Sequence, residues 1–348
     1  MKFFFNHRKQ KMLITSCLLL IITTNKKGVI NMNKFKKLGL TALAGSLVAT
    51  TAFAGEMSVN GNASVTAKNN SNTDGGKSFT MGNQLTFSGG GELDNGLNVS
   101  LSFVLDHGDN VASGFDSHSI SIGNDTIGTF TFAGDGTGNA QSALDTTAAG
   151  DIWDNGFTYG NSRGTAYTAP QGSDANNNKS INWSLPAFVD GLAVAASYSG
   201  SALATNSTTA YGLTYTGVEG LTAYYGAGEV GATADSGDIT SMGVSYAMGS
   251  FTAAYSVNEA DMTTAADEEQ TSFKVSYTVT EDLSVSYGEE THDTNGQSVD
   301  EEFESISVSY TTGGMTITAG NYEAKNLGNT AGVHNEQTRW KLGAAFAF

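Results

Sequence analysis

A polar stretch between residues 135 and 179 gathers charged side chains that can act on ions. A connection of more than about 15 residues without periodic apolar positions is usually functional or disordered. Carboxylates concentrated on one segment attract cations and repel anions. Two interpretations stay open here: an acidic segment on an ion path, or a solvated external loop. The candidate residues are Asp135, Asp145, Asp151, Asp154 and Arg163.

A second set of charges is basic and lies on the polar side of alternating segments. Arg339 and Lys341 alternate with apolar residues, so the two bases share one face of an extended segment. The same parity places Lys68 and Lys274 on the polar face of their own segments. As an alternative, Arg339 and Lys341 form ion pairs with acids of the 135–179 stretch.

The sequence offers little for catalysis or for a bound cofactor. Its histidines after residue 54 are scattered in or beside predicted loops, and serine is too frequent for a Ser-His-Asp combination to be informative. Acid-rich stretches at 258–269 and 289–304 suit weak binding of Ca²⁺ or Mg²⁺, but Ser298 stands where an EF-hand loop needs glycine. We expect no enzyme and no cofactor, and weak binding of divalent cations by external loops remains open.

The elements that must position these charges are β-strands. Apolar residues from Met57 to Ala67 alternate with polar ones, which is typical of a strand with one wet face. The pattern recurs and predicts sixteen strands, joined in pairs by tight turns. Tyrosines precede several turns at regular intervals; they are Tyr215, Tyr246, Tyr277 and Tyr310. Longer polar stretches join the opposite ends of the pairs: 69–77, 106–117, 135–179, 200–208, 229–238, 258–269, 289–302 and 321–335.

An even number of strands, with short connections at one end and long ones at the other, indicates a transmembrane barrel. A sheet crosses lipid only if it closes, because lipid offers no partner for a free backbone group. Sixteen strands leave a water-filled channel, whereas eight are filled by side chains. The alternative is a soluble sandwich, which does not explain the tyrosines beside the turns, where a membrane barrel has its interfacial girdle.

Charge and composition exclude other classes of protein. The 348 residues include 17 basic and 34 acidic side chains, a formal net charge of −17, which argues against nucleic-acid binding. A single cysteine excludes an intrachain disulfide framework.

The first 54 residues are basic and contain no acid. From Met32, a lysine-rich start, an apolar run and Ala52-Phe53-Ala54 fit a secretory signal peptide, and a buried helix or membrane anchor is the alternative. We expect residues 1–31 to be a spurious extension, 32–54 the signal peptide and 55–348 the barrel. The barrel keeps 8 of the 17 basic residues and all 34 acidic ones, a formal charge of −26.

Three stretches resemble the general bacterial porin family of Gram-negative outer membranes. Residues 89–97 resemble the first periplasmic hairpin of these porins, and residues 127–135 resemble the strand that leads into their constriction loop. The apolar alternation at the C-terminus resembles the signal by which outer-membrane barrels are recognised for insertion; its residues are Trp340, Leu342, Phe346 and Phe348.

The resemblance implies an all-β, sixteen-stranded antiparallel barrel with short periplasmic turns and a long third loop, 135–179, folded inward. It places Asp135, Asp145, Asp151, Asp154 and Arg163 at the pore constriction. The bases Lys68, Lys274, Arg339 and Lys341 then lie on the lumen wall. It also implies a homotrimer in the outer membrane, contact with lipid and lipopolysaccharide, and handling by the barrel-insertion machinery.

The expected function is passive diffusion of small polar solutes and ions, with a preference for cations because acids are in excess. Two other functions stay open: a barrel-based outer-membrane enzyme, such as a protease or phospholipase, and a secreted Gly/Asp-rich adhesin.

Overall fold

The computed structural model describes residues 56–69, 76–106, 116–135, 138–157, 179–201, 207–231, 236–332 and 336–348. The predicted extension (1–31) and signal peptide (32–54) lie outside these ranges. The described chain forms sixteen strands: β1 (Glu56–Asn69), β2 (Lys77–Glu92), β3 (Asn98–Asp106), β4 (Ser117–Asn124), β5 (Gly128–Asp135), β6 (Ser180–Ser184), β7 (Leu192–Ser199), β8 (Thr208–Tyr215), β9 (Leu221–Val230), β10 (Gly237–Met248), β11 (Phe251–Met262), β12 (Glu268–Thr278), β13 (Leu283–Thr294), β14 (Glu301–Thr312), β15 (Met315–Lys325) and β16 (Gln337–Ala347).

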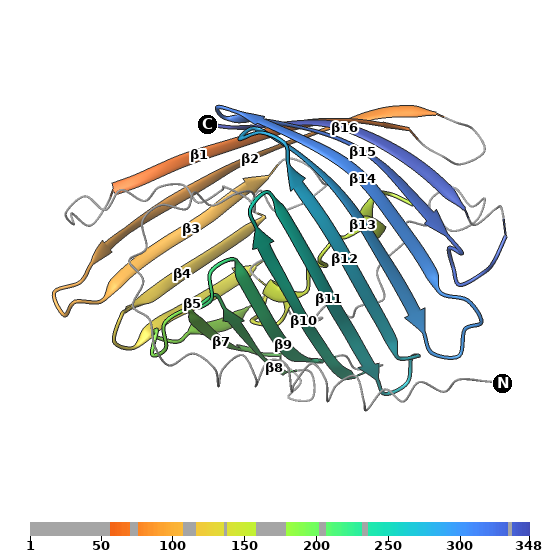
Figure 1. Cartoon of the computed structure of the whole chain (residues 1–348). Coiled ribbons are helices and arrows are strands. Elements are labelled where there is room, and N and C mark those ends of the chain that lie inside the picture. Colours follow the sequence, from red (N-terminus) through yellow and green to blue (C-terminus); the bar gives the residue numbers. More distant parts are fainter. Residues whose placement is uncertain are drawn as a thin grey trace. The chain divides into compact units, whose positions relative to one another are not determined.

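These strands form one closed antiparallel barrel (Figure 1). Each strand pairs with its neighbours in the sequence, and β1 pairs with β16 to close the ring. Phe348 extends this seam, because its N–H donates to Gly61 O at 2.9 Å and the Gly61 N–H donates to Phe348 O at 2.7 Å. Closure leaves no free edge, as crossing lipid requires. The predicted fold class is confirmed.

The two faces of the sheet carry different side chains, as the alternation predicted. Outward-facing Phe79 and Met81 are 71% and 69% exposed. Apolar side chains that are this exposed around a whole barrel are unfavourable in water but favourable in contact with the hydrocarbon of a membrane. On the inward face of the same region, Asn62 Nδ2 donates to Gln84 Oε1 at 2.8 Å. The wall is therefore apolar outside and polar inside.

The tyrosines beside the turns also lie where the sequence predicted. Tyr246, Tyr277 and Tyr310 stand on the outward face within the last three residues of β10, β12 and β14, and all three are exposed. This arrangement matches the aromatic girdle of a membrane barrel at its short-turn end.

Several strands run farther toward the long-loop end than the apolar alternation predicted. The predicted loops 258–269, 289–302 and 321–335 were wrong in extent, because the connections span only 263–267, 295–300 and 326–336. Apolar alternation stops where the wall leaves hydrocarbon, whereas backbone pairing continues. Pairs such as Glu289 with Glu304 extend the sheet with carboxylates on its outward face.

One connection leaves the rim and lies within the ring of strands. Residues 138–157, between β5 and β6, carry the short 3₁₀ helices η1 (Ser142–Leu144) and η2 (Ile152–Asp154), the yellow-green segment of Figure 1. We call residues 138–157 the inner segment. Among the described residues, no helix is long and apolar enough to cross a membrane.

Candidate functional site

Hydroxyl groups on the barrel wall hold the inner segment. Four buried serines, one each on β7, β10, β11 and β12, accept hydrogen bonds from the segment at 2.8–3.0 Å. The pairs are Ala140 N–H to Ser197 Oγ, Gln141 Nε2 to Ser241 Oγ, Ala148 N–H to Ser256 Oγ and Ala149 N–H to Ser272 Oγ. The anchoring serines therefore run from β7 to β12 in the order of the segment's residues, and the segment runs along the inner wall.

Glycines on the wall give this segment room to approach. A Cβ at Gly212 of β8 would lie 2.5 Å from the Ala140 carbonyl oxygen, and one at Gly288 of β13 would lie 2.8 Å from the Ala149 Cβ. Both distances are too short for a real contact. Any larger residue at either place would push the segment toward the lumen axis.

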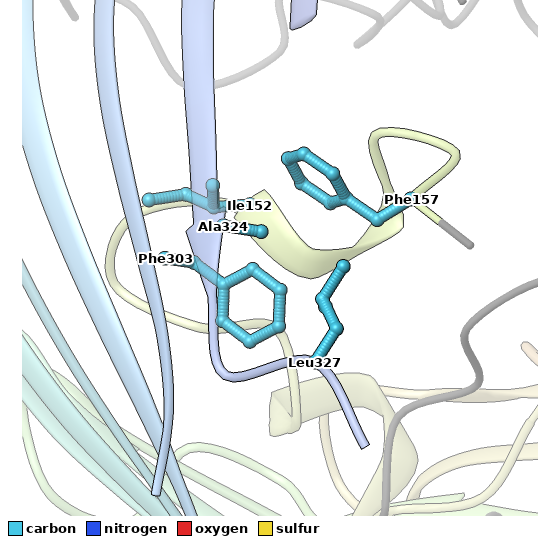
Figure 2. Close-up of a cluster of buried hydrophobic side chains, with 5 residues drawn as sticks. All are labelled: Ile152, Phe157, Phe303, Ala324 and Leu327. Atoms are coloured by element: carbon cyan, nitrogen blue, oxygen red, sulfur yellow. The ribbon is translucent and has the colours of Figure 1, made fainter. Parts of the chain in front are cut away.

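An apolar cluster fixes the far end of the inner segment to the wall. Figure 2 shows Ile152 and Phe157 of the segment facing Phe303 of β14, Ala324 of β15 and Leu327 of the following loop. Each is at most 1% exposed, and the rings of Phe157 and Phe303 lie 5.7 Å apart. Phe157 thus packs against the inner wall, and the partly buried Trp153 packs against the same cluster.

Three of the five predicted constriction residues lie on this segment. Asp145 is partly buried, and Asn258 Nδ2 of β11 donates to its backbone oxygen at 2.7 Å. Burial, and then the nearby Asp151 carboxylate, raise the pKa of Asp145 to about 6. The side chain of Asp135 and the whole of Arg163 lie outside the described part of the chain, so their predicted roles stay predictions.

Asp151 and Asp154 flank the helix η2. Asp151 has a left-handed backbone (φ 54°), which is uncommon for a residue other than glycine and is held here by hydrogen bonds. Its Oδ1 accepts the Thr147 N–H at 3.1 Å, and its own N–H donates to Thr147 Oγ1 at 2.6 Å. Asp154 is exposed.

Two of the predicted lumen bases lie beside Asp154. Lys68 and Lys341 are directly paired across β1 and β16 and share the inward face. Lys341 interacts electrostatically with Asp154, and Lys68 Nζ is 3.6 Å from where a Cβ at Gly156 would stand. Positive and negative groups therefore meet at the end of the inner segment.

The other two predicted bases face the wall side of the inner segment. Arg339 is only 2% exposed; its Cζ lies 5.8 Å from the centroid of the Phe157 ring, and its Nη1 donates to Asn69 O at 3.1 Å. Lys274 of β12 interacts electrostatically with the buried Glu290 of β13. Burial beneath the segment makes Arg339 an anchor rather than a charge in contact with lumen water.

Sequence reasoning missed the residues that hold the segment. Glu290 is 1% exposed; Thr147 Oγ1 donates to its Oε1, and the Trp153 N–H donates to its Oε2 at 3.2 Å. The stretch 289–304 was assigned to a loop, so the inward parity of Glu290 was not considered. Once β13 is known to continue to Thr294, parity alone separates Glu290 from outward-facing Glu289.

A hollow beside the short turns of β3 to β6 is lined mostly by uncharged residues. Inward residues of β3 to β6 and residues 185–187 line this hollow of about 430 Å³. Asp125 is the single charged residue of that lining. The polar side chains are hydroxyls and amides: Asn98, Ser100, Ser121, Asn124, Thr129 and Ser184. Such a surface offers hydrogen bonds to polar solutes of either charge.

The part of the chain that the structure describes contains no candidate metal centre. No three His, Cys, Asp or Glu side chains there are grouped as a metal site needs, so binding of divalent cations stays a prediction. His292 Nδ1 of β13 lies 3.8 Å from Glu301 Oε2, and the His292 side chain is fully buried.

The terminal aromatic residues face outward. Trp340, Leu342 and Phe346 are 38–50% exposed on β16, and the ring of Phe348 lies over Gly61 of β1. They are thus accessible along the seam, and their role as an insertion signal stays a prediction.

A barrel with an acidic segment along its inner wall has the architecture of a diffusion channel, and comparison with known proteins gives the same class. Residues 39–348 match the family described as Gram-negative porin. The chain therefore belongs to the Gram-negative porin family, whose barrels form channels in the outer membrane. A comparison with curated proteins found no match.

Solved porins share the fold at low sequence identity. The anion-selective porin from Comamonas acidovorans superposes with a TM-score of 0.65 at 14% identity, covering 84% of this chain and 99% of that one. OmpF from Salmonella typhi, in complex with daunomycin, gives 0.65 at 13% identity, covering 84% and 97%. OmpT from Vibrio cholerae, in a trimer form, gives 0.58 at 14% identity, covering 85% and 100%.

Proposed function

We propose that this porin carries small polar solutes and ions by passive diffusion and prefers cations. The observation that supports the preference is the placement of Asp145, Asp151 and Asp154 on a segment held along the inner wall. Carboxylates at a narrow point, between walls of low dielectric constant, enrich cations and repel anions.

The side chains, and not the fold, decide the sign of this preference. The porin from Comamonas acidovorans has the same barrel and is described as anion-selective. In the present chain, Lys341 interacts electrostatically with Asp154 and Lys68 lies beside Gly156, whereas Asp145 and Asp151 precede Asp154 and Gly156 on the segment. We therefore expect a moderate cation preference that depends mainly on Asp145 and Asp151.

Reversal potentials in planar bilayers test this function. With a tenfold KCl gradient, the wild-type channel should show a potential of the sign given by K⁺ permeation. Replacing Asp145, Asp151 and Asp154 together by asparagine should move it toward zero. The control replaces three outward acids, Glu259, Glu289 and Glu304, by glutamine and should leave it unchanged. Anion preference of the wild type would refute the proposal.

We also propose that the protein is a homotrimer whose subunits meet through β1 to β6 and β16. Charged side chains on the outward face gather on β9 to β15, where Lys325 pairs with Glu304 at 3.2 Å. The outward face of β1 and β2 is apolar along most of its length, with Met57, Val59 and Phe79 exposed. A second copy can cover such a face without burying charge.

Light scattering in mild detergent tests this assembly. Val65→Lys on β1 should yield monomers, whereas Val308→Lys at a comparably exposed outward position on β14 should remain trimeric. A monomeric wild type, or equal effects of the two variants, would contradict it. Signal-peptide cleavage, lipopolysaccharide contact and the insertion machinery remain predictions.

A further inference from the structure

A buried carboxylate on the wall and a threonine of the inner segment form one connected hydrogen-bond unit. Thr147 Oγ1 donates to Glu290 Oε1 and accepts the N–H groups of Gly150, at 3.1 Å, and Asp151, at 2.6 Å. The second Glu290 oxygen accepts the Trp153 N–H at 3.2 Å. A single side chain on β13 therefore ties down both sides of the turn that contains Asp151.

The same unit sets the conformation of Asp151. The residue has a left-handed backbone, which non-glycine residues adopt only when their surroundings hold them there. Thr147 supplies that restraint twice, through its hydroxyl to the Asp151 N–H and through its N–H to Asp151 Oδ1. The carboxylate of Asp151 thus depends on Thr147 for its position, and Thr147 depends on Glu290.

Burying the Glu290 carboxylate costs free energy, which the contacts around it must offset. A carboxylate that is 1% exposed loses its hydration and must be compensated by hydrogen bonds and nearby opposite charge. The segment supplies the hydrogen bonds, and Lys274 on the adjacent strand supplies the charge. Gly288, two residues before Glu290 on the same face, leaves the space that the segment needs to reach it.

We propose that Glu290 and Thr147 are positioning residues for selectivity, which hold the Asp151 carboxylate at the ion path. This inference rests on the proposed cation preference and assigns its geometry to two residues that do not themselves line the path. Both are buried, at 1% and 4% exposure. The Asp151 carboxylate that they place is half-buried, and it is one of the acids that ions would meet.

Thr147→Val is the decisive variant because it removes the hydroxyl without changing any charge. If the released Asp151 carboxylate moves from about 4 Å to about 8 Å from a passing ion, their attraction in water is halved. We therefore expect the K⁺/Cl⁻ permeability ratio of Thr147→Val to fall about twofold. Thr147→Ser keeps the hydroxyl and should restore the wild-type ratio. Equal ratios for wild type and Thr147→Val would overturn the proposal.

A double-mutant cycle asks whether the effect passes through Asp151. Thr147→Val should change the ratio in the wild-type background but cause no further change in Asp151→Asn. An equal change in both backgrounds would contradict the positioning role.

On the wall side, Glu290→Gln and Glu290→Ala should both lower the K⁺/Cl⁻ permeability ratio, with alanine lowering it more because no acceptor remains. The matched control is Glu289→Gln, which removes an outward carboxylate one residue away and should have no effect.

Open-channel current noise separates this inference from the proposed function, because noise does not depend on the sign of selectivity. Thr147→Val and Glu290→Ala should raise the noise by freeing the turn, while Thr147→Ser and Glu289→Gln should not. If the wild type prefers anions and these variants still raise the noise, the proposed selectivity fails and the anchoring holds. Unchanged noise and an unchanged permeability ratio in Thr147→Val would refute the anchoring, provided that circular dichroism shows a folded barrel.

Discussion

Protonation of Asp145 should weaken the cation preference as the pH falls through about 6. Burial raises the pKa of this carboxyl from its ordinary value of 3.8 to about 6, and the Asp151 carboxylate adds to the shift. A raised carboxyl pKa means that the group is neutral below about pH 6 and charged above it. With a pKa of about 6, the ionised fraction falls from about 97% at pH 7.5 to about 9% at pH 5.

The size of the effect follows from Coulomb's law. A carboxylate about 4–8 Å from a passing cation attracts it by about 0.5–1 kcal/mol in water, which corresponds to a two- to fivefold change in the permeability ratio. Salt reduces this attraction, because the Debye length is about 10 Å at 0.1 M but only about 3 Å at 1 M. The full change should therefore be seen in dilute KCl and fade in concentrated KCl.

The assay is the reversal potential in a tenfold KCl gradient at low ionic strength, measured between about pH 8 and pH 4.5. The wild type should show a step centred near pH 6. Asp145→Asn should remove this step and have a lower cation preference at high pH, whereas Asp154→Asn should keep the step. A step of unchanged size in Asp145→Asn would refute the assignment, and so would a wild-type curve that is flat from pH 8 to pH 5.

Three further changes test the wall and the seam. Replacing Lys68 and Lys341 by glutamine should raise the cation preference, because positive charge is removed from beside the inner segment. The reversal potential should then lie farther from zero, and an unchanged potential would place these bases off the ion path. Phe157→Ala should cost about 3 kcal/mol of unfolding free energy, since the fully buried ring leaves a cavity in the apolar cluster, and an unchanged denaturation midpoint in detergent would contradict the packing. Phe348→Ser should slow assembly of the barrel in lipid vesicles, because the ring covers Gly61 at the closing seam; wild-type assembly kinetics would count against that role.

Much of the architecture could be predicted from the sequence. Alternation along Met57 to Ala67 identified a strand with one apolar face, because a strand exposes successive side chains to opposite sides. The same parity predicts Lys68 and Lys341 on one face, and the two residues are paired across β1 and β16. The length of the 135–179 stretch singled out a connection whose described part, residues 138–157, leaves the rim and lies along the inner wall.

The apolar alternation did not predict the ends of β11 to β15 on the side of the long loops. The strands β11 to β15 extend beyond the regular apolar alternation, so the acidic stretches were assigned to loops. A periodic apolar signal reports contact with hydrocarbon and not hydrogen bonding between strands. Where the outward face of a paired strand carries polar side chains, the signal disappears although the strand persists.

What the sequence determined by itself is thus a closed, two-faced barrel with an acid-rich third loop, since local periodicity and charge are properties of the chain order. Only the tertiary structure decided which charges act on ions and which hold the loop. Glu289 and Glu290 are neighbours of the same chemical type, yet one faces outward and the other is buried beneath Thr147. Arg339 and Lys341 share one face of β16, yet the segment covers Arg339. The path of a long loop across a wall depends on contacts between residues more than a hundred positions apart, and no local pattern encodes them.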